Sequence, residues 1–254
     1  MERVTSRKNS IIIQLRTLGR DRSCRREQGL FICDGEKLLR EAISAGAELD
    51  CVLWCEGEGE NSSLPTGTQQ ISAPLDLVQY VSPLKNSTGP VFSVKLPKNG
   101  EQGRLKNAVV LENLQDPGNV GTVLRTAAAF GIDAVLLVGD CADLFNPKTV
   151  RSTMGAIFRQ SVQELSYEEL EELLRKNELA MYGAALCESA RDIREVNLKN
   201  AAVAIGSEGS GLSENLLNLC SERIIIPMQP ENESLNAAVA ASVAMWEMYR
   251  KGEF

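Results

Sequence analysis

Histidine is absent from the 254-residue sequence. Imidazole is the usual general base of Ser–His–Asp and Cys–His catalysis and a frequent metal ligand, so its absence excludes these catalytic classes and histidine metal sites. No run of eighteen apolar residues occurs, which argues against a membrane-spanning helix. The charged N-terminal segment also lacks the apolar stretch of a secretory signal peptide, and we therefore expect a cytoplasmic protein with no membrane partner.

Cysteine pairs of the CxxC type are also missing, although the chain has seven cysteines. An odd number of cysteines without a secretory signal indicates reduced thiols. Cys51 and Cys55 are spaced like half of a zinc site, but no second pair and no histidine accompany them. We therefore expect no metal, and we interpret the cysteines as small buried hydrophobic residues.

Acidic residues outnumber basic ones, and the resulting net charge of −7 argues at first against a nucleic-acid partner. The first 26 residues differ, because eight basic and two acidic side chains give them a local charge of +6 and leave −13 for the remainder. The basic residues are Arg3, Arg7, Lys8, Arg16, Arg20, Arg22, Arg25 and Arg26. Such an arm is suited to neutralising phosphates, but a solvated helix face would show the same charges.

The first part of the chain has the pattern of a small α/β domain. Residues 30–46 predict a strand, a turn and an amphipathic helix, and residues 51–54 predict a short buried strand. An acidic, polar stretch at 56–70 predicts a surface loop, and residues 71–97 predict a strand, a helix and an edge strand.

A polar segment with proline and glycine follows this pattern. We interpret residues 96–106 as a linker between a domain at 1–95 and a domain at 107–254. In the second domain, short apolar strands alternate with helices, which predicts an α/β fold with a mostly parallel sheet. The strand candidates are AVVLENL, AVLLVG, QSVQEL, LAMYGAAL, AAVAIG and RIIIPM.

Polar residues and glycines gather at three strand-to-helix junctions of the second domain, where α/β sheets bind ligands. The first junction, residues 113–126, contains an Asp-Pro-Gly-Asn turn. This pattern predicts that Asn119 is the N-cap of the following helix. The second, residues 204–212, has three glycines in six residues, which indicates a close approach of the backbone to a ligand or another segment. It matches neither a Walker A loop nor the G-x-G-x-x-G dinucleotide motif.

The third junction, residues 224–236, leads into an alanine-rich helix. Ser234 and Asn236 are the residues suited to cap this helix. Alanines recur on nearly every turn, so we expect the helix to pack closely against another backbone, within the domain or across a dimer.

The three junctions, in this order, resemble the SpoU (TrmH-like) branch of the SPOUT methyltransferases. The first matches N-x-G-x-x-x-R through Asn119, Gly121 and Arg125. The second matches G-x-E-G-x-G-L through Gly206, Glu208, Gly209, Gly211 and Leu212. The third matches I-P-M followed by E-S-L-N through Ile226, Pro227, Met228, Glu233, Ser234, Leu235 and Asn236. Residues 30–46 are similar, more loosely, to the ribosomal-protein-like substrate-binding domain of members that act on ribosomal RNA.

The resemblance implies a C-terminal domain with a deep trefoil knot, an α/β sheet and bound S-adenosylmethionine. It also implies a homodimer formed through the C-terminal domain and an RNA substrate. The implied cofactor-binding residues are Gly206, Gly211, Ile226, Met228 and Leu235, and the implied catalytic residues are Arg125, Asn119, Glu208, Ser234 and Asn236. For the basic arm, the resemblance favours RNA contacts by Arg20, Arg22, Arg25 and Arg26.

The family assigns activation of the attacking hydroxyl to the arginine that matches Arg125. A guanidinium normally stays protonated in proteins, which makes a literal arginine base expensive. Our hypothesis is that Arg125 orients a phosphate and stabilises the developing alkoxide. A second hypothesis is that Glu208 holds Arg125 in place.

The leading interpretation is an S-adenosylmethionine-dependent RNA 2′-O-ribose methyltransferase, with ribosomal RNA as the favoured substrate. One alternative is a transfer-RNA 2′-O-methyltransferase. Another is a non-catalytic RNA-binding or ribosome-assembly protein of the same fold, against which the intact motif residues argue. Methylation of an antibiotic site on ribosomal RNA shares this fold and chemistry, and the sequence does not separate it from housekeeping modification.

Overall fold

The computed structural model describes residues 1–58, 64–97, 103–229 and 234–251. It divides into two compact units, the first formed by residues 1–98 with 143–158, the second by residues 99–142 with 159–254. Much of the predicted linker lies outside the described residues, and the predicted domain limits stay predictions. No helix in the described ranges is long and apolar enough to cross a membrane.

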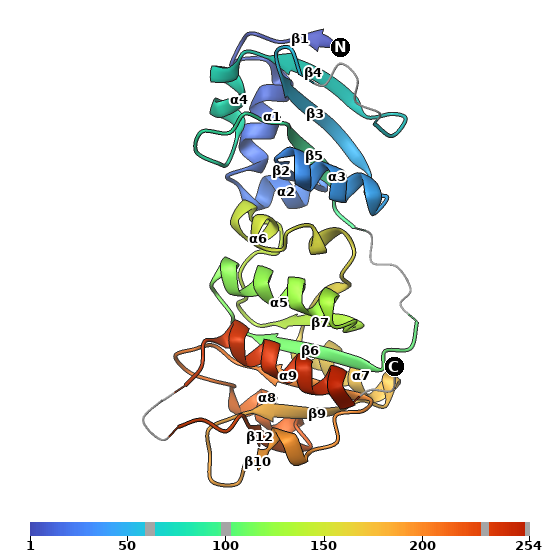
Figure 1. Cartoon of the computed structure of the whole chain (residues 1–254), viewed down its shortest axis with the longest axis vertical. Coiled ribbons are helices and arrows are strands. Elements are labelled where there is room, and N and C mark those ends of the chain that lie inside the picture. Colours follow the sequence, from blue (N-terminus) through green and yellow to red (C-terminus); the bar gives the residue numbers. More distant parts are fainter. Residues whose placement is uncertain (59–63, 98–102, 230–233, 252–254) are drawn as a thin grey trace. The chain divides into compact units, whose positions relative to one another are not determined.

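The first unit has a five-stranded mixed sheet in the order β1-β4-β3-β5-β2 (Figure 1). The strands are β1 (Glu2–Arg3), β2 (Leu30–Asp34), β3 (Leu49–Cys55), β4 (Gln69–Ala73) and β5 (Val91–Lys95). The helices beside them are α1 (Ser10–Leu18), α2 (Arg22–Gln28), α3 (Glu36–Ser44) and α4 (Leu75–Val81). The predicted strand–turn–helix at 30–46 is therefore confirmed.

The prediction that β5 is an edge strand was wrong. This strand lies between β3 and β2 and pairs antiparallel with both. Its residues Val91, Phe92 and Val94 are all buried, although successive side chains point to opposite faces of the sheet. Burial of both faces is typical of a central strand. The polar residues on either side of β5 are also typical of an edge strand, so the sequence alone did not indicate the central position.

Strand β2 explains how the first unit is held together. Leu30 and Ile32 belong to the apolar core that includes Leu15 of α1. Phe31 points to the other face, where its ring centroid lies 4.9 Å from that of Phe145 and 6.2 Å from that of Phe158. These two rings belong to the segment 143–158, with α6 (Pro147–Ser152) and the 3₁₀ helix η1 (Ala156–Phe158), and their packing attaches the segment to the first unit.

The second unit has a seven-stranded sheet in which every neighbouring pair is parallel. Its order is β10-β12-β9-β11-β6-β7-β8, so the predicted parallel α/β fold is confirmed. The strands are β6 (Asn107–Glu112), β7 (Ala134–Val138), β8 (Val162–Leu165), β9 (Ala180–Ala184), β10 (Arg191–Asp192), β11 (Ala201–Ile205) and β12 (Glu222–Ile225). The two-residue β10 is too short to give a sequence pattern. The knot stays a prediction.

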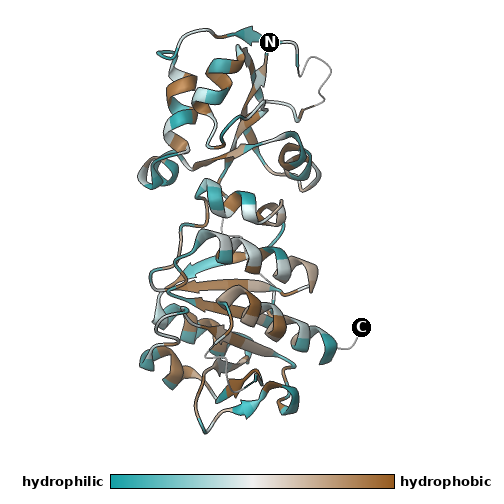
Figure 2. Ribbon diagram, turned by 60° about the vertical axis from the view of Figure 1, so that its left-hand side comes forward, coloured by the Kyte–Doolittle hydropathy of each residue, from teal (hydrophilic) through white to brown (hydrophobic). Residues whose placement is uncertain are grey.

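Helices cover both faces of this sheet (Figure 1). Helices α5 (Pro117–Ala129) and α9 (Ala237–Lys251) pack together on one face, and α7 (Tyr167–Asn177) and α8 (Glu214–Leu219) pack on the other. The strands between them are apolar on both sides, and Figure 2 shows the central ones in brown.

The alanine-rich helix α9 packs within the unit, against α5 and against strands β6 and β11. The alanines on its inner face are buried: Ala237, Ala238, Ala241 and Ala244. Such small side chains let two helix backbones approach closely. The sequence allows α9 to pack against a backbone of its own domain or of a second copy. The structure contains the packing inside the domain.

Candidate cofactor and active site

A cavity of about 480 Å³ opens in the second unit at the carboxyl ends of β9, β11 and β12. This volume lies within the usual range of small-ligand sites, about 300–1,000 Å³. The five residues that the sequence predicts for cofactor binding all line it: Gly206, Gly211, Ile226, Met228 and Leu235. Ser234, predicted as catalytic, lines it too. The structure thus brings together residues from two of the three junctions around one space.

The glycine-rich loop after β11 closes on itself at the edge of this cavity. A Cβ atom added to Gly206 would lie 2.1 Å from the carbonyl carbon of Gly211 and 2.5 Å from the amide nitrogen of Leu212, so the loop ends can meet only without a side chain there. Gly211 has a φ of +66°, and its amide donates to the Ser207 carbonyl at 2.9 Å. Gly209, by contrast, has open space around it. Loop closure therefore requires two of the three glycines.

Two helix caps position the polar residues beside the loop. Asp116 caps α5 by accepting a hydrogen bond from the Asn119 amide at 2.9 Å, so the predicted cap at Asn119 was wrong. Pro117 starts the helix directly after Asp116, since proline is favoured at the first helical position. Asn236 caps α9, as predicted, by accepting from Ala238 at 3.0 Å.

The Glu208 carboxylate joins the three motif segments. Its Oε1 atom accepts hydrogen bonds from Asn119 Nδ2 at 2.8 Å and from Asn236 Nδ2 at 2.6 Å. Asn236 also donates to Asn119 Oδ1 at 3.2 Å, and the Ala237 amide reaches Glu208 at 3.3 Å. Asn119 and Asn236 are 117 residues apart in the sequence, so this network is a product of the fold. Three of the five predicted catalytic residues thus form one hydrogen-bonded cluster.

Arg125 lies on α5 with an exposed side chain. It makes no hydrogen bond or ion pair with any residue that the structure describes. The hypothesis that Glu208 holds Arg125 was therefore wrong, since no hydrogen bond or ion pair joins these two described residues, and Oε1 of Glu208 instead accepts from two side-chain amides and one backbone amide.

The basic arm also needs one correction. Arg25 is only 4% exposed, its guanidinium donates to the Leu18 carbonyl at 2.7 Å, and it forms an ion pair with Asp143. A buried guanidinium with these partners offers no surface to a phosphate, so the predicted RNA contact by Arg25 was wrong. Arg20, Arg22 and Arg26 are exposed and stay predicted contacts.

Sequence reasoning missed a cationic stack on the first unit. The guanidinium carbons of Arg16 and Arg7 lie 3.4 Å and 4.4 Å from the centroid of the Tyr80 ring. Arg16 also donates to the Tyr80 carbonyl at 2.7 Å. Tyr80 is 64 residues from Arg16, and no local pattern connects the two.

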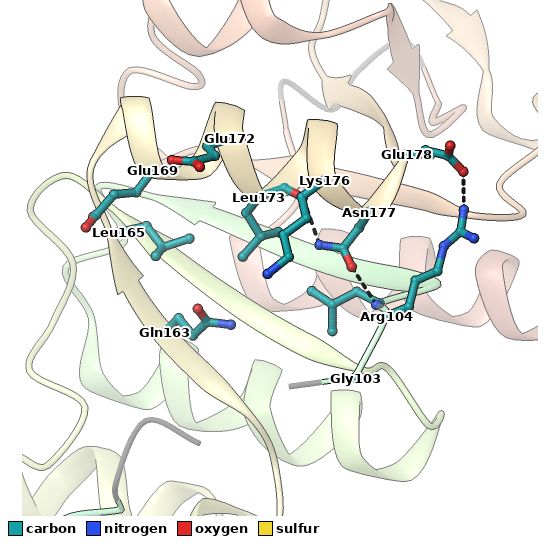
Figure 3. Close-up of a pocket in the computed structure, with 11 residues that line it drawn as sticks. Gly103, Arg104, Gln163, Leu165, Glu169, Glu172, Leu173, Lys176, Asn177 and Glu178 are labelled. Carbon is teal, nitrogen blue, oxygen red and sulfur yellow. Dashed lines mark hydrogen bonds and ion pairs between the residues drawn. The ribbon is translucent and has the colours of Figure 1, made fainter. Parts of the chain in front are cut away.

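A second hollow of the second unit, of about 620 Å³, lies between α7, β8 and residues 103–105 (Figure 3). Acidic side chains of α7 and the residue after it line it, among them Glu169, Glu172 and Glu178. Asn177 holds its wall by accepting from the Leu105 amide and donating to the Leu173 carbonyl, both at 2.8 Å. No predicted site residue lines this hollow, and its charged lining also contains Arg104 and Lys176.

Comparison with known proteins identifies the second unit's sequence. Residues 106–246 match the model of the SpoU rRNA Methylase family, more than half of the chain. The chain belongs to the SpoU family. Residues 9–91 match the MRM3-like substrate binding domain, in agreement with the looser resemblance of the N-terminal part.

Relatives of the SpoU chain match it over nearly its whole length. An uncharacterised tRNA/rRNA methyltransferase of Synechocystis is 30% identical and is matched over 98% of this chain and 93% of its own length. The 23S rRNA (guanosine(2553)-2′-O)-methyltransferase RlmP of Bacillus subtilis is 28% identical, with 98% and 99% covered. The AdoMet-bound rRNA methyltransferase of Sinorhizobium meliloti has a TM-score of 0.89 at 25% identity, with 98% and 97% covered.

S-adenosylmethionine fits the chemistry of the SpoU cavity. The partly buried apolar side chains of Ile226, Met228 and Leu235 offer a wall for a flat adenine ring. The backbone of the loop from Gly206 to Gly211 offers amide and carbonyl groups without side chains in the way. An apolar lining with a few polar groups is typical of cofactor sites.

The Gly206→Ala variant tests whether loop closure shapes this cavity. We expect weaker S-adenosylmethionine binding and a lower melting temperature, because the added methyl group meets the Gly211 backbone and overpacking costs about 1–3 kcal/mol. Gly103→Ala is the matched control, since its Cβ also meets open space, it lies in the same unit outside the cofactor cavity, and both quantities should stay unchanged. Titration calorimetry and thermal unfolding measure the two effects, and equal affinities in the two variants would contradict the assignment.

Proposed function

We propose that this SpoU protein methylates a ribose 2′-hydroxyl of ribosomal RNA with S-adenosylmethionine. The observation that carries the proposal is the meeting of three motif segments at Glu208, beside the cavity lined by Gly206 and Leu235. When bound there, S-adenosylmethionine would supply a methyl group activated by a sulfonium, whose leaving group is a neutral thioether. The protein therefore has to assist the hydroxyl, whose proton passes to solvent, rather than the leaving group.

Arg125 is the residue available for that assistance. Its exposed guanidinium, a cationic group with several hydrogen-bond donors, has no partner among the described residues. A fixed cation can orient an RNA phosphate and stabilise the alkoxide as it forms. Asn119, Glu208 and Asn236 position the loop and helix that border the site, and Ser234 lies at the cavity wall.

Ribosomal RNA is favoured over transfer RNA as the substrate. The MRM3-like domain covers residues 9–91, and the relative RlmP is named for a 23S rRNA nucleotide. The first unit adds exposed cations at Arg20, Arg22 and Arg26, which suit the RNA backbone. We place the protein in the cytoplasm, where its substrate is assembled. A non-catalytic role is disfavoured because Arg125 is intact and exposed.

The outer face of α9 supports a homodimer through the C-terminal domain. Trp246 is 48% exposed and stacks on Tyr249, with ring centroids 5.8 Å apart, and both contact Phe130 at the end of α5. Val239, on the same helix, is 48% exposed. Clustered exposed aromatic residues mark protein interfaces, and a second copy of the chain would cover them.

Methyl-labelled S-adenosylmethionine, incubated with ribosomal and transfer RNA from a strain lacking the gene, tests the activity. We expect label in one 2′-O-methylnucleoside of ribosomal RNA after digestion. In the same assay Arg125→Ala should lower kcat by about 10²–10³-fold through lost charge stabilisation. Arg125→Lys should recover only part of it, because an ammonium lacks the planar fork of donors. Label on a base or only in transfer RNA, or full activity of Arg125→Lys, would contradict the proposal.

Neutralisation of the exposed arm tests RNA binding by the first unit. Changing Arg20, Arg22 and Arg26 together to Gln should weaken RNA binding and reduce the slope of log K against log salt by up to about three. Three exposed arginines of the second unit provide a control with the same charge change: Arg104, Arg191 and Arg194. Filter binding across a salt series measures both sets. Equal losses in the two triple variants would refute a specific role of the arm.

Trp246→Glu tests the homodimer. A charge introduced into an exposed aromatic cluster should convert the protein to a monomer, because a buried unpaired charge opposes association. Ile13→Glu is a matched control, since Ile13 is an apolar residue of the first unit with a similar exposure of 51%. Analytical ultracentrifugation measures the mass of each variant. A monomeric wild-type protein, or a dimeric Trp246→Glu variant, would show that this face has another role.

A further inference from the structure

Glu112, at the end of β6, is a fully buried carboxylate with 0% exposure. It forms no ion pair with any basic group in the described part of the chain. Its hydrogen bonds come from neutral donors, Tyr167 and Ser213. Burying a carboxylate without a cation is costly, and the cost is offset only by complete hydrogen bonding. The arrangement therefore indicates that Glu112 serves a purpose that an apolar residue could not.

The hydrogen bonds of Glu112 lead to one end of the glycine-rich loop. Oε2 accepts from the backbone amide of Ser213 at 2.7 Å, and Oε1 accepts from its hydroxyl at 2.5 Å. Ser213 directly follows Leu212, the last residue of the G-x-E-G-x-G-L motif. Its hydroxyl also accepts from the Leu216 amide at 3.2 Å and so begins α8. One carboxylate thus fixes where the loop ends and where the next helix begins.

The other end of the loop is held beside the same residue. Leu111 pairs with Ile205 in the parallel ladder of β6 and β11, so Glu112 follows one partner just as Gly206 follows the other. The loop from Gly206 to Leu212 therefore leaves the sheet next to Glu112 and returns to it at Ser213. A loop of seven residues with three glycines has high conformational entropy, which such a double attachment reduces.

Tyr167, the first residue of α7, holds Glu112 from the helix next to α8. Its hydroxyl donates to Oε1 at 2.7 Å. This hydrogen bond raises the pKa of Tyr167, with burial adding to the effect, and the phenol stays a donor over the physiological range. The carboxylate is therefore fixed in one orientation before any ligand binds.

We propose that Glu112 is a positioning residue for S-adenosylmethionine, which acts by holding the Gly206–Leu212 loop in its binding shape. The inference rests on the proposed cofactor site, because that loop lines the cavity. The carboxylate receives three hydrogens and donates none. A glutamine can keep the hydrogen bond from the Ser213 amide only by turning its NH2 group toward the Tyr167 and Ser213 hydroxyls, so both charge-assisted hydroxyl hydrogen bonds are lost and the two hydroxyls have to accept instead.

Glu112→Gln is the first test, with S-adenosylmethionine affinity measured by titration calorimetry. We expect the Kd to rise about tenfold to a hundredfold, as for the loss of a hydrogen bond to a charged group. The Kd for RNA and the kcat at saturating S-adenosylmethionine should stay within about twofold of the wild-type values. The kinetic effect should therefore be confined to the KM for S-adenosylmethionine. Amide hydrogen exchange at residues 206–213 should accelerate. An unchanged cofactor Kd in the folded variant would overturn the proposal.

Asn177→Asp is the matched control. Asn177 is a buried polar residue of the same unit, 8% exposed, and the swap again exchanges an amide and a carboxylate of equal size. It breaks the hydrogen bond to the Leu173 carbonyl beside the hollow of Figure 3, so it destabilises the unit without touching the loop. Its cofactor Kd should equal that of the wild type. An equal rise in both variants would reduce the effect of Glu112 to general destabilisation.

Two milder variants keep the test decisive if Glu112→Gln does not fold. Ser213→Ala removes a hydrogen bond that comes from the loop end itself, whereas Tyr167→Phe removes one that comes from α7 to the same carboxylate oxygen. Ser213→Ala should weaken S-adenosylmethionine binding more than Tyr167→Phe does, and the reverse order would overturn the proposal. Gly206→Ala separates the two hypotheses. If it leaves the cofactor Kd unchanged, the proposed cofactor site is wrong, whereas an effect of Gly206→Ala without one of Ser213→Ala refutes only the positioning role.

Discussion

The site depends on one constraint, the convergence of three distant segments on the Glu208 carboxylate. Asn119 lies 89 residues before Glu208, and Asn236 lies 28 residues after it. A parallel sheet satisfies this constraint because the carboxyl ends of all its strands share one edge, whatever their separation in sequence. The cavity, the closed loop and the start of α9 then occupy that edge together.

The hydrogen bonds around Glu208 also require that α5 and α9 begin at particular residues. Asp116 and Pro117 begin α5 two residues ahead of Asn119, which leaves the Asn119 side chain free to turn toward Glu208. Asn236 divides its amide group, because Oδ1 caps α9 while Nδ2 binds Glu208. The hydrogen bonds that begin the two helices therefore also determine where the polar residues of the site lie.

Much of this architecture could be predicted from the sequence, for identifiable reasons. The central strands of the second unit are apolar on both faces, and the alternation of strands with helices indicates a parallel sheet before any coordinates are known. The three glycines of residues 206–211 indicate a close backbone approach, and the resemblance to the SpoU branch implied five cofactor-binding residues that the structure places around one cavity.

What could not be predicted was the choice of partner among chemically equivalent groups. A carboxylate beside an arginine predicts an ion pair, yet Glu208 binds two amides, since the fold brings those closer. Arg25 and its exposed neighbour Arg26 cannot be told apart by their sequence surroundings. Arg25 nevertheless lies on the face of α2 that contacts Asp143. Partners 118 residues away leave no trace in local charge or periodicity. Glu112 escaped notice for the same reason, because its donors lie 55 and 101 residues further along.

The charge distribution suggests how the two units divide the work. The chain outside its first 26 residues carries a net −13, so it has little general attraction for a polyanion. On the proposed function, affinity for RNA would come mainly from the arm, through phosphates and without sequence preference. On the same proposal, Arg125 is the cation that shares α5 with Asn119, and its position, rather than the total charge, would determine where methylation occurs. The first unit would then hold the RNA, and the second would select the reacting ribose.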